Sequence, residues 1–295
     1  MSRLTCFFVL LIIFSCKDKP SPISTPKIKE LQTSALIKTF KYKEGDKPLI
    51  SVHRGGSGLK NYPENCLETL KYVNDSISAI FEIDVAKTKD DVLVLMHDNS
   101  LERTTTGTNR LDSYTYDELL AFNLVDDFRA ETNFKIPKFT DVLVWAKKNN
   151  AVLTIDIKRS VDVSEIIKVI KKYDAQDISI IITYDVDQTE KAYKLAPNLL
   201  MSVSARNEEE LNRLLQTSIP VENMLAFTGT RLSDSKLYED LHKLGIKTIL
   251  GTLGNLDRQA AAKNDSLYMI WHNKGIDIIA TDRPFQAASA LKIVK

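Results

Sequence analysis

The sequence predicts an α/β protein of the (β/α)8 TIM barrel class, with a short β-hairpin extension after the second strand. From residue 48 almost to the end of the chain, short runs rich in β-branched residues alternate with amphipathic helical patterns. This alternation is typical of βα units around a parallel sheet. The composition, with 43% hydrophobic and 27% charged residues and a formal charge of +1, is that of an ordinary globular protein and gives no sign of nucleic-acid binding.

Nine apolar runs have the character of strands, one more than an eight-stranded barrel needs. They are Leu49–Val52, Ala79–Val85, Val92–Met96, Ala151–Ile157, Ile178–Ile182, Leu199–Val203, Met224–Phe227, Thr248–Leu250 and Ile276–Ala280. Only the six residues AKTKDD separate the second run from the third, whereas a parallel crossover needs about a dozen residues or more. We therefore expect these two runs to form an antiparallel hairpin, which leaves eight parallel strands for a closed barrel.

The turn of this hairpin determines which residues lie opposite one another. With Lys89 and Asp90 at the tip, His97 is expected opposite Glu82, and a shift of two residues places it opposite Asp84. Either register puts the histidine on the same sheet face as both carboxylates, because directly opposed residues share a face. The hairpin thus predicts a site that joins a histidine to an acidic pair.

Two helices and one long connection are also predicted from the pattern of apolar residues. Val163–Tyr173 and Glu208–Gln216 each carry one apolar stripe and are expected to be helices with one buried face. The connection from Leu101 to Asp141 is long for a βα unit and contains a further helical pattern at Tyr116–Phe122. Connections of this length in compact enzymes often form lids or substrate walls, so we expect this one to cover the barrel mouth.

The first 47 residues are predicted to lie outside the barrel. A positive start, the apolar run Phe7–Phe14 and a small residue before Cys16 are typical of a lipoprotein signal peptide over residues 1–16, with Cys16 as the lipidated residue. A plain membrane anchor and a soluble signal peptide are the alternatives, although the run is short for a membrane span. Residues 17–47 are expected to form a tether and N-terminal segment, followed by the barrel over residues 48–295. We therefore expect a protein held to a membrane of the bacterial envelope by its lipid, either periplasmic or exposed at the cell surface.

Polar residues that suit a reaction site stand at or near the ends of the predicted strands. They are His53, Glu82, Asp84, Asp156 and Asp282. Active sites of (β/α)8 barrels lie at strand ends. Clustered oxygen donors suit a hard cation such as Mg²⁺ or Ca²⁺, while a carboxylate pair equally suits glycoside hydrolysis. The nearby cations Arg54 and Lys158 favour a bound anion, because a metal ion together with arginine and lysine is a natural clamp for phosphate.

These residues lie in motifs that resemble the glycerophosphodiester phosphodiesterase family, in order, from Leu49 to Pro284. The matching segments are HRGG at His53, PENCLETL at Pro63, FEIDV with Glu82 and Asp84, TKDDVLVLMHD ending in His97-Asp98, LERTTTGT at Leu101, IPKFTDVL at Ile136, IDIK at Ile155 and GIDIIATDRP at Gly275. The resemblance implies a TIM barrel that hydrolyses glycerophosphodiesters to glycerol 3-phosphate and an alcohol. It also implies a divalent cation, Mg²⁺ or Ca²⁺, and a small phosphodiester as the substrate.

The same resemblance implies a role for each site residue. The metal ligands would be Glu82, Asp84 and Asp156, the acid/base pair His53 and His97, and the substrate-binding residues Arg54, Lys158, Glu64 and Asn65. Two imidazoles exchange protons readily near neutral pH, and we expect His53 to be the base and His97 the acid. Asp98, Arg103 and Asp282 are expected to support a turn, the following loop and the barrel end.

Two departures from the family pattern concern the metal and the substrate. Asp156 stands where the family usually has glutamate, so we expect its shorter side chain to reach the cation directly or through a water. The segment Ile249–Asp257 lacks the family's usual tryptophan, and Gly251 and Gly254 are expected to leave room near the mouth. Two alternatives therefore stay open: a related phospholipase or phosphodiesterase that acts on another headgroup or releases a cyclic phosphate, and a binding barrel without turnover.

Overall fold

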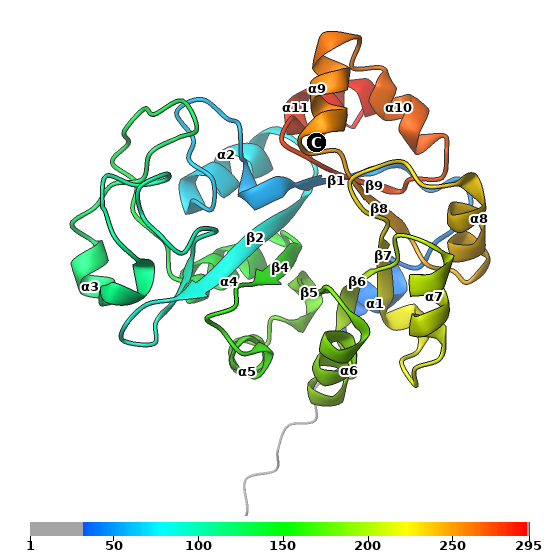
Figure 1. The fold of residues 1–295 in the computed structure, drawn as a ribbon, viewed down its shortest axis with the longest axis horizontal. Helices are drawn as coiled ribbons and strands as arrows, with labels where there is room; N and C mark the ends of the chain where they lie inside the picture. The colour runs from blue at the N-terminus through cyan, green and yellow to red at the C-terminus, as the bar shows by residue number, and fades with distance from the viewer. Residues whose placement is uncertain (1–31, 294) are drawn as a thin grey trace, which may run out of the picture. The chain divides into compact units, whose positions relative to one another are not determined.

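A closed barrel of parallel strands lies at the centre of the fold, and helices surround it (Figure 1). The computed structural model describes residues 32–293 and 295. The strands in this part of the chain are β1 (Leu49–Val52), β2 (Ile80–Lys87), β3 (Leu93–Leu95), β4 (Leu153–Ile157), β5 (Ser179–Thr183), β6 (Leu200–Ser204), β7 (Met224–Phe227), β8 (Thr248–Gly251) and β9 (Ile278–Thr281). Because β1 pairs in parallel with both β2 and β9, eight strands form a closed ring. The predicted (β/α)8 TIM barrel is confirmed.

The helices mostly follow the strands one by one, as the sequence pattern indicated. The α-helices are α1 (Ala35–Thr39), α2 (Leu67–Ser76), α3 (Tyr116–Leu119), α4 (Phe139–Asn149), α5 (Val163–Lys172), α6 (Val186–Leu195), α7 (Glu208–Leu215), α8 (Ser235–Lys243), α9 (Asn255–Ala262), α10 (Leu267–His272) and α11 (Pro284–Leu291). Short 3-10 turns lie at η1 (His53–Gly55), η2 (Leu111–Ser113), η3 (Gln176–Ile178) and η4 (Val221–Asn223). The two predicted amphipathic helices are confirmed to within one residue. Among the described residues, no helix has both the length and the apolar character needed to cross a membrane.

The predicted hairpin is present, but its predicted register is wrong by one residue. β2 and β3 pair antiparallel with Val85 opposite Leu95 and Lys87 opposite Leu93. The loop has three residues instead of two: Thr88 N–H donates to Val92 O (3.0 Å), and Asp91, the third loop residue, has φ +62°. A type I turn followed by a left-handed residue is a common three-residue hairpin loop.

In this register, part of one edge of β2 pairs with no strand, and both histidines lie beside that part. β1 ends at Val52, opposite Phe81, and β3 approaches along the same edge from the other direction. The last backbone hydrogen bond to β2 from the residues after β3 comes from Met96, whose N–H donates to Asp84 O (3.0 Å). His53 follows the end of β1 and His97 follows the end of β3. His97 therefore lies beyond the ladder, not opposite either carboxylate, yet still beside both.

The long connection from Leu101 to Asp141 is an ordered cover with a small core of its own. The core residues are Cys66, Ala86, Val94, Met96, Leu101, Leu111, Leu119, Leu124 and Ile136. The predicted helix at Tyr116–Phe122 is present in shorter form as α3. Asp127 of this connection accepts from Gly58 N–H (2.6 Å), so the connection covers the side of the barrel mouth above β1 and β2.

The opposite end of the barrel interior is closed by the N-terminal segment. Leu36 and Phe40 from α1 and the turn after it join an apolar cluster with strand residues that face the barrel axis. Tyr42 N–H then donates to Gly245 O (2.9 Å). The described part of the predicted tether thus packs against the barrel. The predicted signal peptide and lipidated Cys16 lie outside the described residues and stay predictions.

We expect Phe40→Ala to destabilise the barrel without a direct effect on the barrel mouth at the other end. Phe40 is 6% exposed, and removal of a buried phenylalanine ring costs about 3–5 kcal/mol of unfolding free energy. The measurement is urea unfolding followed by circular dichroism. Val144→Ala on α4, where the side chain is 54% exposed, is the control and should change stability by less than about 0.5 kcal/mol. Equal unfolding midpoints for the two variants would contradict the conclusion that the N-terminal segment closes this end of the barrel interior.

Candidate active site

Three carboxylates project into the barrel from two neighbouring strands. Phe81, Ile83 and Val85 pack outward against the helices, so the alternation of β2 turns Glu82 and Asp84 inward. β4 places Asp156 directly beside Asp84 in the parallel ladder. One oxygen from each of the three acids lies within 4.8 Å of the others. The structure thus gathers the three predicted metal ligands in one place.

Lys158 lies over two of these acids. Its Nζ is 2.6 Å from Asp84 Oδ1 and 2.8 Å from Asp156 Oδ2. Burial acts to lower the pKa of Lys158, but the two carboxylates outweigh burial, and the pKa is raised. The lysine therefore stays charged and offsets part of the negative charge of the cluster.

Arg54 sits in a strained turn directly beside the cluster. Its backbone has φ +50°, a left-handed conformation that is unusual for a residue other than glycine. In this position Arg54 N–H donates to Glu82 Oε2 (2.7 Å) and Nη1 donates to the buried carboxylate of Glu64 (3.1 Å). Arg54 Nε is buried without a hydrogen-bond partner. The turn thus aims both backbone and side-chain donors at the site.

Glu64 and Asn65 stand behind the site instead of lining its cavity. Asn65 donates from Nδ2 to Asp84 Oδ2 (2.7 Å) and accepts from Asp84 N–H (2.9 Å). Burial acts to raise the pKa of Glu64, but hydrogen bonds and charge from Arg103 and Arg54 prevail, and the pKa is lowered. In the structure both residues hold other site residues in place, and their part in substrate binding stays a prediction.

The two histidines are each held by a carboxylate through the same ring nitrogen. His53 Nδ1 lies 2.6 Å from Asp282 Oδ1, and His97 Nδ1 lies 2.6 Å from Asp98 Oδ1. The pair of His53 and Asp282 follows from barrel closure. The pairing of β1 with β9 aligns Val52 with Thr281, so the residues that come next, His53 and Asp282, also lie side by side. Both imidazoles line the same cavity, and with Nδ1 engaged, Nε2 is the nitrogen available to a ligand.

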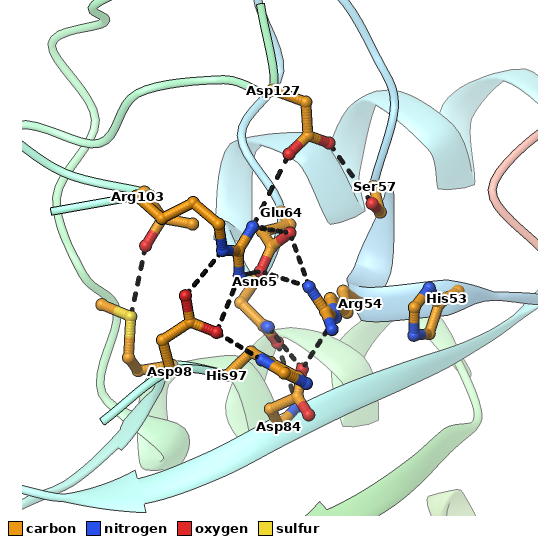
Figure 2. A network of polar contacts seen from close by, with 12 residues as sticks. His53, Arg54, Ser57, Glu64, Asn65, Asp84, His97, Asp98, Arg103 and Asp127 are labelled. Carbon is orange, nitrogen blue, oxygen red and sulfur yellow. Dashed lines mark hydrogen bonds and ion pairs between the residues drawn. The ribbon is translucent and has the colours of Figure 1, made fainter. Parts of the chain in front are cut away.

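A network of ion pairs links His97 to Arg54 (Figure 2). Arg103 donates to Asp98 Oδ2 from Nε (2.6 Å) and to Glu64 from both terminal nitrogens (2.7 and 2.9 Å). Glu64 also binds Arg54, as described above. The hydrogen bond from Arg103, together with the one from His97, lowers the pKa of Asp98 to about 2 although burial acts in the opposite direction. One buried glutamate therefore couples the positions of both arginines and, through Asp98, of one histidine.

The residues surround a cavity of about 360 Å³ whose two halves differ in character. The charged half comes from β1, β2 and β4 and the residues after them, with His97 after β3: His53, Arg54, Glu82, Asp84, His97, Asp156 and Lys158. The other half, from β5 to β9, is uncharged and includes Ile182, Thr183, Ser202, Ser204, Phe227, Ile249, Leu253 and Ala280. All seven charged or imidazole residues were predicted from the sequence, and the structure brings them together.

The prediction that Gly251 leaves room at the mouth is wrong. A Cβ atom at this position would lie 3.1 Å from the side chain of Thr230, 3.3 Å from Phe227 and 3.4 Å from Leu253. These side chains already fill the space, and Phe227 of β7 supplies an aromatic ring to the cavity wall. A Cβ at Gly254 would meet no atom within 4 Å. The cavity wall thus has an aromatic residue from β7, whereas the segment Ile249–Asp257 has no tryptophan.

Three residues that were expected to have supporting roles bind residues of the site. Asp282 and Asp98 each hold a histidine, and Arg103 ties Asp98 to Glu64. An acid directly after a predicted strand end marked Asp282, and its adjacency to His97 marked Asp98, so both signals were present in the sequence. Arg103 had no such signal, because its partners depend on how the long connection folds back over the barrel.

Comparisons with known proteins agree with this geometry. The glycerophosphoryl diester phosphodiesterase family model matches residues 53–283. A glycerophosphoryl diester phosphodiesterase structure from Parabacteroides distasonis is similar with a TM-score of 0.82 and 32% identity, over 89% of this chain and 93% of that one. Human glycerophosphodiester phosphodiesterase 1 is 31% identical over 154 residues, which span 51% of this chain and 42% of the human protein.

A second solved structure shares the fold at lower identity. It is an Oleispira antarctica phosphodiesterase in complex with the product sn-glycerol-3-phosphate, with a TM-score of 0.68 and 20% identity, over 87% of this chain and 99% of that one. The family match covers every residue of the charged half of the cavity. The chain therefore belongs to the glycerophosphoryl diester phosphodiesterase family, whose named relatives are phosphoric diester hydrolases.

Proposed function

We propose that this protein hydrolyses glycerophosphodiesters to glycerol 3-phosphate and an alcohol, with a divalent cation and with His53 and His97 as the acid/base pair. The observation that carries the proposal is the placement of two carboxylate-held histidines beside one cluster of acids and cations in a single cavity. The structure of the Oleispira antarctica phosphodiesterase in complex with the product sn-glycerol-3-phosphate supports the choice of substrate class.

The chemistry of the acidic cluster fits a hard divalent cation. Asp156 Oδ1 is buried and has no hydrogen-bond partner within residues 32–293, so an acceptor is available there. Burial and the nearby charge of Asp84 raise the pKa of Glu82 well above its usual range. Mg²⁺ and Ca²⁺ take oxygen ligands, and Glu82, Asp84 and Asp156 would hold one of them here. When bound, the cation neutralises phosphate charge in the substrate.

Arg54 and Lys158 are placed to bind the phosphate. Both line the cavity on the side of the acids, and Arg54 Nε, 3.9 Å from Asp84 Oδ2, donates no hydrogen bond to any described residue. Lys158 now bridges Asp84 and Asp156, and if those acids held a cation, the Lys158 ammonium group would be available to a phosphate oxygen. Fixed donors that are aimed at a phosphoryl group stabilise the charge that develops during its transfer.

The histidines differ in how their carboxylates are neutralised, and this difference assigns their roles. Asp98 is shared with Arg103, whereas the side chain of Asp282 has His53 as its partner among the described residues. A carboxylate without a competing cation stabilises the imidazolium more strongly. We therefore assign His53 as the base that takes the proton of the attacking hydroxyl, and His97 as the acid that protonates the departing alcohol.

The first test is an assay of the purified chain from residue 32 onward with glycerophosphoethanolamine, in Mg²⁺, Ca²⁺ or EDTA. We expect glycerol 3-phosphate to form with at least one cation and to fall to background in EDTA. The product is measured with a coupled glycerol 3-phosphate dehydrogenase reaction, and heat-denatured protein is the blank. Absence of product with glycerophosphoethanolamine, glycerophosphocholine and glycerophosphoserine alike, under both cations, would overturn the proposal.

The acid/base pair is tested by His53→Ala and His97→Ala. Each variant should lose more than about 100-fold in kcat, the usual effect of one acid/base group, and Asp282→Asn should lose more than Asp98→Asn. His272→Ala is the matched control, because His272 Nδ1 bonds to the backbone oxygen of Ile276 away from the cavity (2.8 Å). Each variant must keep the wild-type melting temperature. A variant at either site histidine with wild-type kcat would show that the pair is assigned wrongly.

The metal site is tested by Glu82→Gln in the absence of substrate. A carboxyl group with a raised folded-state pKa destabilises the protein once it ionises, so metal-free wild-type stability should fall as the pH rises above the ordinary glutamate range. The glutamine variant should lack this fall and should be more stable than the metal-free wild type near pH 8. It should also lose the stabilisation that the bound metal gives, which is about 2.7 kcal/mol at a metal concentration of 100 times the Kd. The measurement is the rise in melting temperature on addition of metal.

The exposed Glu239 on α8 supplies the control for this experiment. Glu239→Gln should keep both the pH dependence and the metal response of the wild type. A Glu82→Gln protein that still responds to Mg²⁺ and Ca²⁺ as the wild type does would remove Glu82 from the ligand set.

A further inference from the structure

The catalytic cavity continues into a groove between the connections that follow β4 and β5. The groove has a volume of about 560 Å³ and shares Asp156, Lys158 and Tyr184 with the catalytic cavity. Its outer walls include Arg159 and Gln188. A group attached to a phosphate beside Lys158 would therefore have direct access to this groove.

Arg159 is the unsatisfied cation of this groove. Its guanidinium makes no hydrogen bond or ion pair with any residue in the part of the chain that the structure describes, and the residue is exposed. The other cation of the outer wall, Lys191, is paired with Asp162 (2.5 Å). Gln188 Oε1 accepts from Tyr184 N–H (3.0 Å), which leaves the Gln188 amide NH₂ as a further donor. The groove thus offers donors and one net positive charge.

A second hollow beside the cavity lacks this property. It has a volume of about 280 Å³ and meets the catalytic cavity at Tyr184 and Ser204. Its arginines are already neutralised: Arg206 donates to both oxygens of Glu210 (2.6 and 3.0 Å), and Arg213 lies 3.4 Å from Glu209. An anionic ligand would gain little from these paired cations.

We propose that the alcohol part of the substrate lies in the groove beside Arg159, and that Arg159 selects alcohols that carry their own anionic group. This inference rests on the proposed hydrolysis of glycerophosphodiesters. A guanidinium matches the geometry of a carboxylate or a phosphate through paired N–H donors. A quaternary ammonium would instead meet an unpaired positive charge, and Tyr184 is the one aromatic residue among those that line the groove.

The test compares glycerophosphoserine with glycerophosphoethanolamine, because these substrates differ only by the carboxylate of the alcohol. We expect wild-type kcat/KM to be about fivefold higher for the serine diester. This is the preference that an ion pair partly exposed to solvent gives, since such a pair contributes up to about 1 kcal/mol. Arg159→Gln should reduce this ratio to near one, mainly by lowering kcat/KM for the serine diester. Added KCl should reduce the wild-type ratio in the same way, since the contact is exposed to solvent.

The control variant is Arg213→Gln in the second hollow, which should leave the ratio unchanged. A second pair, glycerophosphoinositol and its 4-phosphate, tests the phosphate as the anionic group. A preference for the charged member of either pair that depends on Arg159 supports the inference and identifies the anion. A kcat/KM ratio near one in the wild type for both pairs would overturn the inference. A ratio that Arg159→Gln leaves unchanged, or that Arg213→Gln changes as much as Arg159→Gln does, would also overturn it.

These outcomes are distinct from failure of the proposed function. If both ethanolamine and serine diesters are hydrolysed at equal rates, the proposed function stands and only the role of Arg159 falls. If no glycerophosphodiester is hydrolysed with either cation, the proposed function fails, and the inference about the alcohol falls with it.

Discussion

Mutual repulsion among three buried acids is the constraint on which the catalytic end of the barrel depends. Glu82, Asp84 and Asp156 are held together by strand pairing, and burial together with the charges of Asp84 and Asp156 raises the pKa of Glu82. Charges brought out of water need partners. Lys158 and Arg54 supply part of the compensation, yet Asp156 Oδ1 accepts no hydrogen bond from the described residues. The fold therefore builds a site that one further cation would complete.

The two histidines are positioned by different means, and the difference follows from where they lie in the barrel. His53 depends on closure of the sheet, because pairing of β1 with β9 brings Asp282 beside it. His97 lies beyond the end of a three-residue strand and has no such support. Its place depends on the ion-pair network through Asp98 and Arg103 to Glu64, which requires the long connection to fold over the barrel mouth.

Several features of the site could be predicted from the sequence because they depend on local spacing. A six-residue connection is too short for a parallel crossover, so the hairpin followed from counting. The register did not, since a left-handed Asp91 adds a third residue to the loop. Gly251 suggested open space, but whether space is filled depends on distant side chains, here Phe227 and Thr230.

The sequence by itself determined the barrel, its hairpin and the seven charged or imidazole residues of the cavity, because strand alternation and motif order are properties of neighbours along the chain. Only the tertiary structure decided which carboxylate holds which histidine, that Glu64 and Asn65 stand behind the cavity, and that Arg159 is left unpaired beside it. Those facts arise between residues up to 229 positions apart. Their partners are chosen by barrel closure and by the packing of connections over the mouth, which the spacing of residues along the chain does not specify.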